Sequence, residues 1–221
     1  MADYKKIDHW QQKARKEGYP ARSVYKLKEI DEKFALFKPI RGEKGGAGGA
    51  SFASGASGTS VRILDLGAAP GSWSLYVLRK LGARCFLAAA DLSPLSREFD
   101  KGLFDSGNFF FIQGDITTAL VREALFEKGP YSTIISDAAP STTGNHTVDA
   151  ARSLGLAEEV INYAEKTLAA GGNLALKVFQ GGDSAALLKR MKLLFETARS
   201  FKPQACRGES VETYFIGLNK R

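Results

Sequence analysis

Cysteine and histidine are scarce in this chain, with two of each among 221 residues. The cysteines, Cys85 and Cys206, lie far apart and form no spaced ligand pair, so we expect no zinc-type metal site. Two cysteines without such a pattern also favour a reducing compartment, and we expect a cytoplasmic protein.

Long hydrophobic runs are also lacking. The chain has no stretch of about 18 apolar residues, and residues 1–6 are not followed by the apolar segment of a secretory signal. With 44% hydrophobic and 25% charged residues, the composition is otherwise that of an ordinary globular protein. We therefore expect no membrane association and one sizeable α/β domain.

The G-x-G-x-x-G fingerprint of dinucleotide-binding proteins is a third absence. Instead, the apolar segment 61–66 leads into a turn in which Gly67 and Gly71 stand four residues apart, and Ser72 can cap a helix. A strand, a glycine turn and a helix N-terminus together form a site for a nucleotide-like ligand. Because the third glycine is missing, a pyrophosphate cofactor is disfavoured and an adenosine without phosphates, such as S-adenosylmethionine, fits better. A turn that serves packing alone is the alternative.

Strand-like and helix-like segments alternate after residue 61, which is typical of a doubly wound parallel sheet. Apolar runs predict strands and amphipathic segments predict helices. The expected strands are 61–66, 84–92, 109–113, 131–137, 173–180 and 211–219, and the expected helices are 72–81, 148–169 and 184–197. Gly171 and Gly172 are expected to end the second of these helices.

Four aspartates stand in or at the ends of successive strands: Asp65, Asp91, Asp115 and Asp137. Asp91 follows Gly67 by 24 residues, a separation at which an acid can bind both hydroxyls of a ribose. Asp115 is placed for an adenine amino group, and Asp137 for the region of the methyl group. A single aspartate after a strand is usually a turn residue, but four in register indicate a ligand site.

Positive charge is concentrated near the N-terminus. The net charge is +7, and residues 1–28 hold eight basic and three acidic side chains, so +5 of it lies there. Such a segment suits binding to a polyanion. Trp10, Tyr19 and Tyr25 lie among the charges and favour single-stranded or loop RNA, whose bases stack on aromatic rings. A solvated charged helix is the alternative interpretation.

The chain divides into three expected parts. Residues 1–41 form a basic, helical RNA-binding extension. Its apolar stripe packs on the main domain, leaves Lys26 and Lys28 pointing away, and consists of Val24, Leu27, Ile30 and Phe34. Residues 42–60 are rich in glycine and serine and predict a flexible insertion, to which we assign no chemistry. Residues 61–221 form the catalytic domain.

Three segments resemble the FtsJ/RrmJ family of RNA 2′-O-ribose methyltransferases: LDLGAAPGSW at 64–73, SDAAP at 136–140 and LKVFQG at 176–181. The resemblance runs from about residue 19 to the C-terminal end, and the segment 42–60 departs from it. It implies a Rossmann-like class I methyltransferase fold with a seven-stranded, mostly parallel sheet. It also implies S-adenosylmethionine as the donor, no metal, a monomer, and a uridine of large-subunit (23S) ribosomal RNA or the ribosomal particle as substrate.

The resemblance also implies particular site residues. The family's Lys-Asp-Lys-Glu tetrad falls on Lys26, Asp137, Lys177 and Glu212. The cofactor contacts fall on Gly71, Trp73, Asp91, Asp115 and Asp137. Because a ribose hydroxyl is a poor nucleophile, positioning supplies much of the rate. Lys177 is the candidate to accept the hydroxyl proton or to orient the hydroxyl, and the sequence leaves both roles open.

Other functions stay open at this point. Some relatives methylate tRNA or capped mRNA. The Asp/Asn-Pro-Pro-aromatic loop of amino-group methyltransferases and the Pro-Cys nucleophile of carbon-5 enzymes are absent. Two further classes are an NAD-dependent oxidoreductase, disfavoured by the incomplete fingerprint, and a non-enzymatic RNA-binding assembly factor, disfavoured by the intact tetrad. His146 lies in a polar loop and is expected to be solvated.

Overall fold

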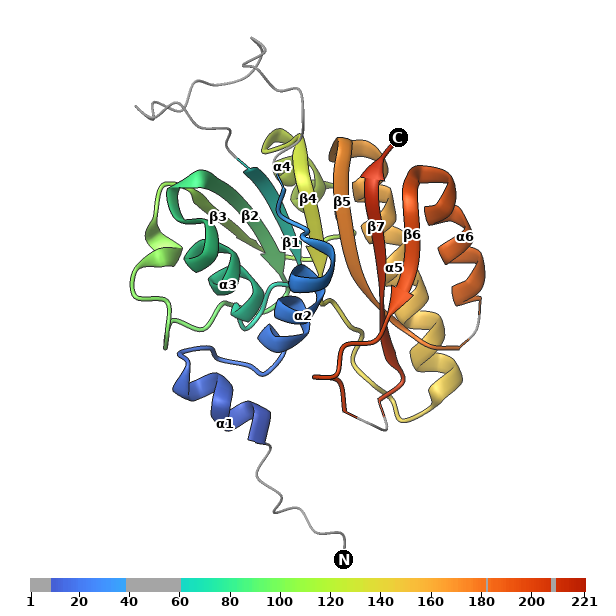
Figure 1. Ribbon diagram of the computed structural model, residues 1–221, viewed down its shortest axis with the longest axis horizontal. Coiled ribbons are helices and arrows are strands. Elements are labelled where there is room, and N and C mark those ends of the chain that lie inside the picture. The colour runs from blue at the N-terminus through green and yellow to red at the C-terminus, as the bar shows by residue number, and fades with distance from the viewer. Residues whose placement is uncertain (1–8, 39–60, 182, 208–209) are drawn as a thin grey trace, which may run out of the picture.

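The computed structural model describes residues 9–38, 61–181, 183–207 and 210–221. The glycine- and serine-rich segment 42–60 lies outside these residues. Within them, seven strands form one sheet in the order β3-β2-β1-β4-β5-β7-β6 (Figure 1). The strands are β1 Val61–Leu66, β2 Cys85–Asp91, β3 Phe109–Gln113, β4 Tyr131–Ser136, β5 Leu168–Phe179, β6 Phe195–Phe201 and β7 Glu212–Lys220.

Most strand pairs are parallel. The pairs β1–β2, β2–β3, β1–β4 and β4–β5 are parallel, whereas β7 runs antiparallel to both of its neighbours, β5 and β6. The strand order therefore reverses between β1 and β4, and such a reversal opens a crevice at the carboxyl ends of the strands. The predicted doubly wound, mostly parallel α/β sheet is confirmed.

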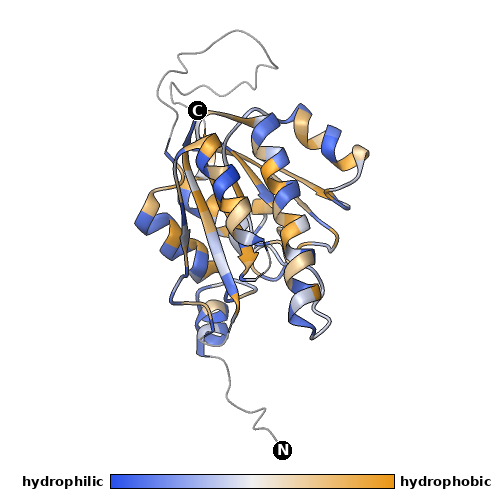
Figure 2. Cartoon of the chain, turned by 90° about the vertical axis from the view of Figure 1, so that its right-hand side faces the viewer, coloured by the Kyte–Doolittle hydropathy of each residue, from blue (hydrophilic) through white to orange (hydrophobic). Residues whose placement is uncertain are grey.

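Helices cover both faces of the sheet (Figure 1). They are α1 His9–Lys16, α2 Val24–Phe34, α3 Ser72–Leu81, α4 Ala119–Glu127, α5 His146–Thr167 and α6 Ser184–Leu194. The first three contribute to one hydrophobic core and the last three to the other. In Figure 2 the helices carry both hydrophilic and hydrophobic colours, as elements with one buried side should. None of the described helices has the length and apolar character needed to cross a membrane.

The two cores follow from the alternation of side chains along each strand. On β1, Ile63 packs into the core under α2 and α3, and its neighbour Leu64 packs into the core under α4, α5 and α6. Asp65 comes next on β1 and therefore faces the same side as Ile63. A polar side chain on that side must lie between the sheet and the helices α2 and α3.

The glycine pair at 171–172 does not end α5, so this expectation was wrong. The helix ends at Thr167, and β5 begins directly at Leu168 with both glycines inside it. Gly171 has a φ of +77°, and the register between β4 and β5 shifts next to this part of β5. The glycines therefore form an irregularity in the strand, which is a second common role of glycine in β structure.

The strand β6 was missed, and the helix expected to reach residue 197 stops at Leu194. The sequence FETARSF places polar residues between apolar ones and resembles a continued amphipathic helix. It becomes a strand because it pairs with β7, from Phe195–Lys220 to Phe201–Tyr214. Tertiary pairing thus overrides local preference at the sheet edge. The helix α4 was also not predicted.

The N-terminal helices pack on the main domain much as the apolar stripe predicts. Val24, Leu27 and Ile30 are fully buried, and Phe34 packs edge-on against Phe201 of β6. Tyr19 and Tyr25 are also buried, with 7% and 5% of their surfaces exposed. Contrary to expectation, these two rings cannot stack on nucleobases, because the protein already covers them.

Candidate active site

A cavity of about 420 Å³ opens at the carboxyl ends of the central strands. Its walls combine the glycine turn after β1, the ends of β2, β3 and β4, and the β5 lysine. The side chains and backbone that line it are Ser23, Gly67, Ala69, Pro70, Asp91, Leu92, Gly114, Asp115, Ile116, Asp137, Ala138, Ala139, Pro140, Ser141, Leu156 and Lys177. The cavity therefore brings together four of the predicted residues: Asp91, Asp115, Asp137 and Lys177.

The turn after β1 needs glycine for a steric reason. Gly67 has a φ of +78°, and a Cβ built there would lie 2.5 Å from the Cα of Ala138. This close approach brings the turn against the segment that follows β4. The turn and that segment form adjacent walls of the cavity, so a larger residue at position 67 would push them apart.

Two carboxylates at the rim are held by backbone amides. Asp91 accepts hydrogen bonds from the amide of Ala69 through Oδ2 at 2.9 Å and from the amide of Ser93 through Oδ1 at 2.8 Å. Asp115 accepts from the amide and hydroxyl of Thr117, both at 2.8 Å, and these bonds lower its pKa. Both groups are therefore fixed acceptors at the cavity edge.

The four residues of the predicted tetrad form two ion pairs. Lys177 Nζ lies 3.0 Å from Asp137 Oδ1, and Lys26 Nζ lies 2.7 Å from Glu212 Oε1. The four side chains are between 9% and 17% exposed. Lys177 also donates to the backbone carbonyl of Asp137. Because they are largely withdrawn from water, these pairs are screened less than surface pairs.

Tyr214 adds a hydrogen bond to the Lys177–Asp137 pair, and the sequence did not single it out. It stands opposite Lys177 in the β5–β7 register and donates from Oη to Asp137 Oδ1 at 2.6 Å. Glu212 lies two residues earlier on β7, on the same face of the strand. Burial raises the pKa of Tyr214 well above its ordinary value of 10, so it remains a donor. Its two-residue spacing from Glu212 was the signal available in the sequence.

Trp73 and Gly71, both expected to contact a cofactor, do not line the cavity. The Trp73 indole is 2% exposed and donates from Nε1 to the carbonyl of Ser23 at 2.9 Å. Its ring packs against Tyr214, with centroids 5.9 Å apart. Gly71 caps α3 with a φ of +106°, and a Cβ there would contact Phe104 at 2.8 Å. Trp73 therefore links α3 to Ser23 and to β7, and Gly71 leaves room for Phe104 at the start of α3.

Asp65 lies beneath the site and not at its rim. Its side chain is completely buried, Ser74 Oγ donates to Oδ2 at 2.7 Å, and Oδ1 has no hydrogen-bond partner among the described residues. Burial raises the pKa of Asp65 from its ordinary value of 3.8 to about 7, and the charges of Asp137 and Asp91 add to this effect. Only three of the four predicted acids therefore face the cavity.

We expect Asp65→Asn to remove a pH-dependent loss of stability. The pKa of Asp65 is raised in the folded state, so the folded protein gains relative stability below pH 3.8 and loses it as the pH rises towards about 7. In urea unfolding, the variant should match the wild type near pH 4 and exceed it above pH 7 by up to about 4 kcal/mol. Glu123→Gln, on the exposed side of α4, is the control. Parallel stability curves for Asp65→Asn and the wild type would contradict this.

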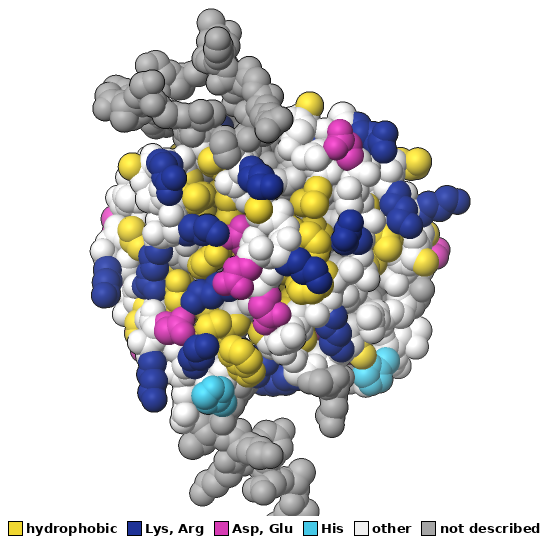
Figure 3. Space-filling model, viewed as in Figure 1, with side chains coloured by type: hydrophobic (Ala, Val, Ile, Leu, Met, Phe, Trp, Pro, Cys, Tyr) yellow, Lys and Arg dark blue, Asp and Glu magenta, His cyan; other side chains and the backbone are white. Residues whose placement is uncertain are grey.

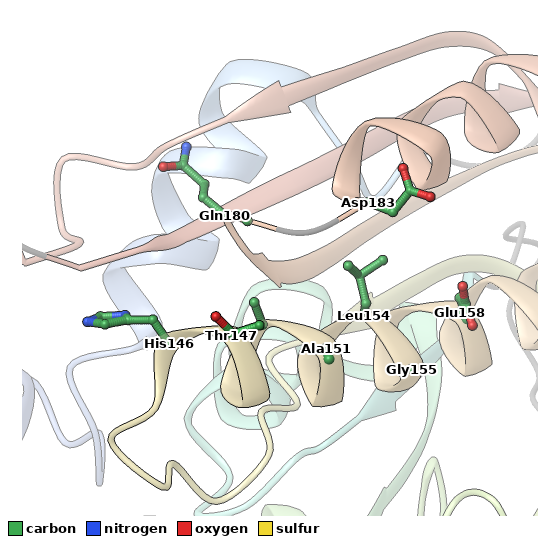
Figure 4. A pocket seen from close by; sticks show the side chains of 10 residues that line it. His146, Thr147, Ala151, Leu154, Gly155, Glu158, Gln180 and Asp183 are labelled. Atoms are coloured by element: carbon green, nitrogen blue, oxygen red, sulfur yellow. The ribbon is translucent and has the colours of Figure 1, made fainter.

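A second hollow, of about 520 Å³, lies between α5 and the segment after β5 (Figure 4). His146, Thr147, Leu154 and Glu158 form one wall, and Gln180 and Asp183 stand on the other side. Its described lining contains two carboxylates and neither lysine nor arginine, and none of the predicted site residues contributes to it. We therefore place the chemistry in the first cavity. Across the described chain, no cluster of His, Cys, Asp and Glu is arranged to hold a metal.

Comparison with known proteins identifies relatives of this chain. A sequence profile of the FtsJ-like methyltransferase family matches residues 19–220. A relative from Treponema denticola, named ribosomal RNA large subunit methyltransferase E, is 46% identical over 216 residues, which cover 98% of this chain and 96% of the relative. A relative of the same name from Oleidesulfovibrio alaskensis is 41% identical over 213 residues, covering 96% and 90%.

The fold also has a counterpart among solved structures. A crystal structure described as a ribosomal RNA methyltransferase from Plasmodium falciparum superposes with a TM-score of 0.69. It is 23% identical and covers 91% of this chain and 98% of its own, which supports the fold alone. The family profile and the two bacterial relatives together show that the chain belongs to the FtsJ-like methyltransferase family.

Proposed function

We propose that this protein transfers the methyl group of S-adenosylmethionine to a ribose 2′-hydroxyl of large-subunit ribosomal RNA. The observation that carries this proposal is the pair of lysine–carboxylate contacts beside the cavity, Lys177–Asp137 and Lys26–Glu212. A weakly acidic hydroxyl requires a group that fixes its direction of attack and a positive charge near the oxygen as its proton leaves. The two lysines meet both requirements.

The cavity suits the methyl donor by charge. Among the described residues, its lining holds three carboxylates, at Asp91, Asp115 and Asp137, and a single cation, Lys177. An acidic lining favours a cationic sulfonium and disfavours the pyrophosphate of a dinucleotide. Asp91 is proposed to bind the ribose hydroxyls and Asp115 the adenine amino group, with apolar contacts to the base from Leu92 and Ile116. This distribution of charge supports a methyl donor over the NAD cofactor of an oxidoreductase.

Gly71 and Trp73 are proposed to support the cofactor through their neighbours. Gly71 starts α3 next to the turn that lines the cavity. Trp73 joins α3 to Ser23, which is itself a lining residue, and packs on Tyr214. Ser72 adds a further link, because its hydroxyl exchanges two hydrogen bonds with the backbone of Ala21 at 2.8 and 3.1 Å. These contacts fix the N-terminal segment against the cavity.

The lysines have separate proposed tasks. The Lys177 ammonium carries three hydrogens and uses two on the carboxylate and carbonyl of Asp137. The third is available to the oxygen of the substrate hydroxyl, and it would hold a lone pair towards the methyl carbon. When bound, S-adenosylmethionine supplies an electrophilic methyl group on a good leaving group. Lys26, held by Glu212, would offset the negative charge that grows on the hydroxyl oxygen as its proton passes to water. The products are then the methyl ether, S-adenosylhomocysteine and a proton released to solvent.

A basic face supports RNA as the substrate. Figure 3 shows lysine and arginine side chains spread over the face that carries α1 and α2, around a smaller group of acids. The exposed lysines and arginines of α1, α2, β6 and the described part of the β6–β7 connection are Lys13, Arg15, Lys16, Lys33, Arg199, Lys202 and Arg207. Such a surface attracts a phosphate backbone without reading its sequence. The described part of the extension, residues 9–38, is therefore proposed to bind RNA. The substrate class comes from the names of the two bacterial relatives.

Mapping ribose methylation across total RNA tests the proposal. In cells that lack this protein, we expect one position in the large-subunit ribosomal RNA to lose its 2′-O-methyl group. The purified protein with S-adenosylmethionine should restore it on RNA or ribosomal particles from those cells. Loss at a tRNA position would support the alternative substrate. An unchanged map, with RNA binding retained, would favour the non-enzymatic assembly factor.

A further inference from the structure

Two other charged residues, Arg22 and Glu29, lie near Lys26 in the chain. Glu29 lies three residues after Lys26, on the same side of α2, and Arg22 stands in the turn just before the helix begins at Val24. This side faces the segment between β6 and β7, of which residues 202–207 and 210–211 are described. The start of α2 and this connection therefore contact each other through charged side chains.

Glu29 holds two consecutive amides of that connection. Its Oε2 accepts a hydrogen bond from the amide of Gln204 at 2.7 Å, and its Oε1 accepts one from the amide of Ala205 at 2.8 Å. Arg22 completes the contact by donating from Nη2 to the carbonyl of Ala205 at 2.6 Å. A carboxylate bound to two neighbouring amides fixes the backbone in both position and direction.

The β6–β7 connection that Glu29 binds runs on to Glu212, a residue of the tetrad. Cys206, the next residue, is buried, and burial together with the charge of Glu212 raises the pKa of its thiol to about 12. Glu212 itself begins β7 and pairs with Lys26. The 2.7 Å contact between Lys26 and Glu212 therefore joins α2 to the start of β7, and Glu29 joins α2 to the connection before β7.

The helix α2 is not part of the sheet, so its position relative to β7 depends on such contacts. Its apolar side is packed, but apolar packing is non-directional and tolerates small sliding movements. An ion pair at 2.7 Å has less tolerance, because hydrogen bonds weaken steeply when their geometry is lost. A directional contact one turn from Lys26 would limit this sliding.

We propose that Glu29 is a positioning residue for methyl transfer: it clamps the β6–β7 connection to α2 and so holds Lys26 against Glu212. The inference rests on the proposed function, because it acts through the tetrad. Glu29 itself does not line the methyl-donor cavity. Its loss should therefore affect the rate of the bound complex more than the binding of the methyl donor.

The test compares Glu29→Ala and Glu29→Gln with Glu32→Ala. Glu32 is exposed on the same helix and has the same charge, so it controls for general effects on α2. For Glu29→Ala we expect kcat to fall about tenfold or more, with the Kd for S-adenosylmethionine within about twofold of wild type. Glu29→Gln keeps an amide oxygen as an acceptor and should recover part of kcat. Glu32→Ala should behave as wild type.

Hydrogen exchange provides a readout that does not depend on activity. The amides of Gln204 and Ala205 should exchange faster in Glu29→Ala, and less so in Glu29→Gln, while Glu32→Ala matches the wild type. If these amides exchange faster and kcat stays within about twofold of wild type, Glu29 only stabilises the β6–β7 connection and the inference is wrong. A wild-type protein that transfers no methyl group to RNA would instead overturn the proposed function.

Discussion

Replacing Lys177 with methionine is expected to lower kcat for methyl transfer by about a thousandfold while S-adenosylmethionine still binds. Methionine keeps most of the length and apolar volume of the side chain but has no N–H groups. The substrate hydroxyl then loses its orienting contact, and Asp137 loses the cation 3.0 Å from Oδ1. Transfer of a labelled methyl group under single-turnover conditions would measure the effect, with donor binding followed by calorimetry.

Two further variants serve as controls for Lys177→Met. Lys189→Met removes an exposed lysine from α6, away from the tetrad, and should leave kcat unchanged. Lys177→Arg keeps a cation but gives it a planar, wider donor group, so it should also bind S-adenosylmethionine and recover little of the rate. If Lys177→Met keeps a substantial share of the wild-type kcat, Lys177 has no direct part in the reaction.

Reversing two charges on α1 is expected to weaken RNA binding by about tenfold or more at low salt. Lys13 and Lys16 are both exposed, whereas Arg15 is paired with Glu98 and is left intact. In Lys13→Glu/Lys16→Glu, two phosphate contacts are lost and replaced by repulsion. The plot of log affinity against log salt concentration should become shallower by about two units. Donor affinity should stay the same.

The matched control reverses two charges elsewhere. Lys189→Glu/Lys192→Glu changes the net charge by the same amount on exposed positions of α6. Lys13 also lies over the rings of Trp10 and Tyr25, so thermal unfolding of the α1 variant should be measured alongside binding. Equal RNA affinity and equal salt slopes for the two double variants would show that α1 is not an RNA-binding surface.

The sequence predicts those parts of the fold that local patterns determine. The first and third strands match β1 and β3 residue for residue, and the helix expected at 72–81 matches α3. These segments are short, apolar and bounded by glycine or charged turns, so their boundaries are encoded nearby. The carboxylates at the ends of β2 and β4 follow from the same pattern, because parallel strands end on one side of a sheet.

Features that depend on distant partners were not visible. The segment at 195–201 becomes β6 only because β7 pairs with it. Asp65 has the same strand position that a ligand-binding acid would have, but Ser74 and the packed helix α3 enclose it. Trp73 points to Ser23 and Tyr214 because an appended helix lies across it. In each case the outcome depends on residues remote in the sequence, which periodicity does not reveal.

The pairing of β6 with β7 has a consequence for how the chain folds during synthesis. Within the described sheet, β6 bonds only to β7, yet β6 precedes β7 in the chain. During synthesis from the N-terminus, β6 must therefore emerge before its partner exists. Glu212 and Tyr214 arrive with that partner, so a nascent chain can already contain Lys26, Asp137 and Lys177 without a complete tetrad. A fragment cut before β7 would lack Glu212 and Tyr214 and leave the β6 segment without its partner, so it should be inactive even when it folds in part.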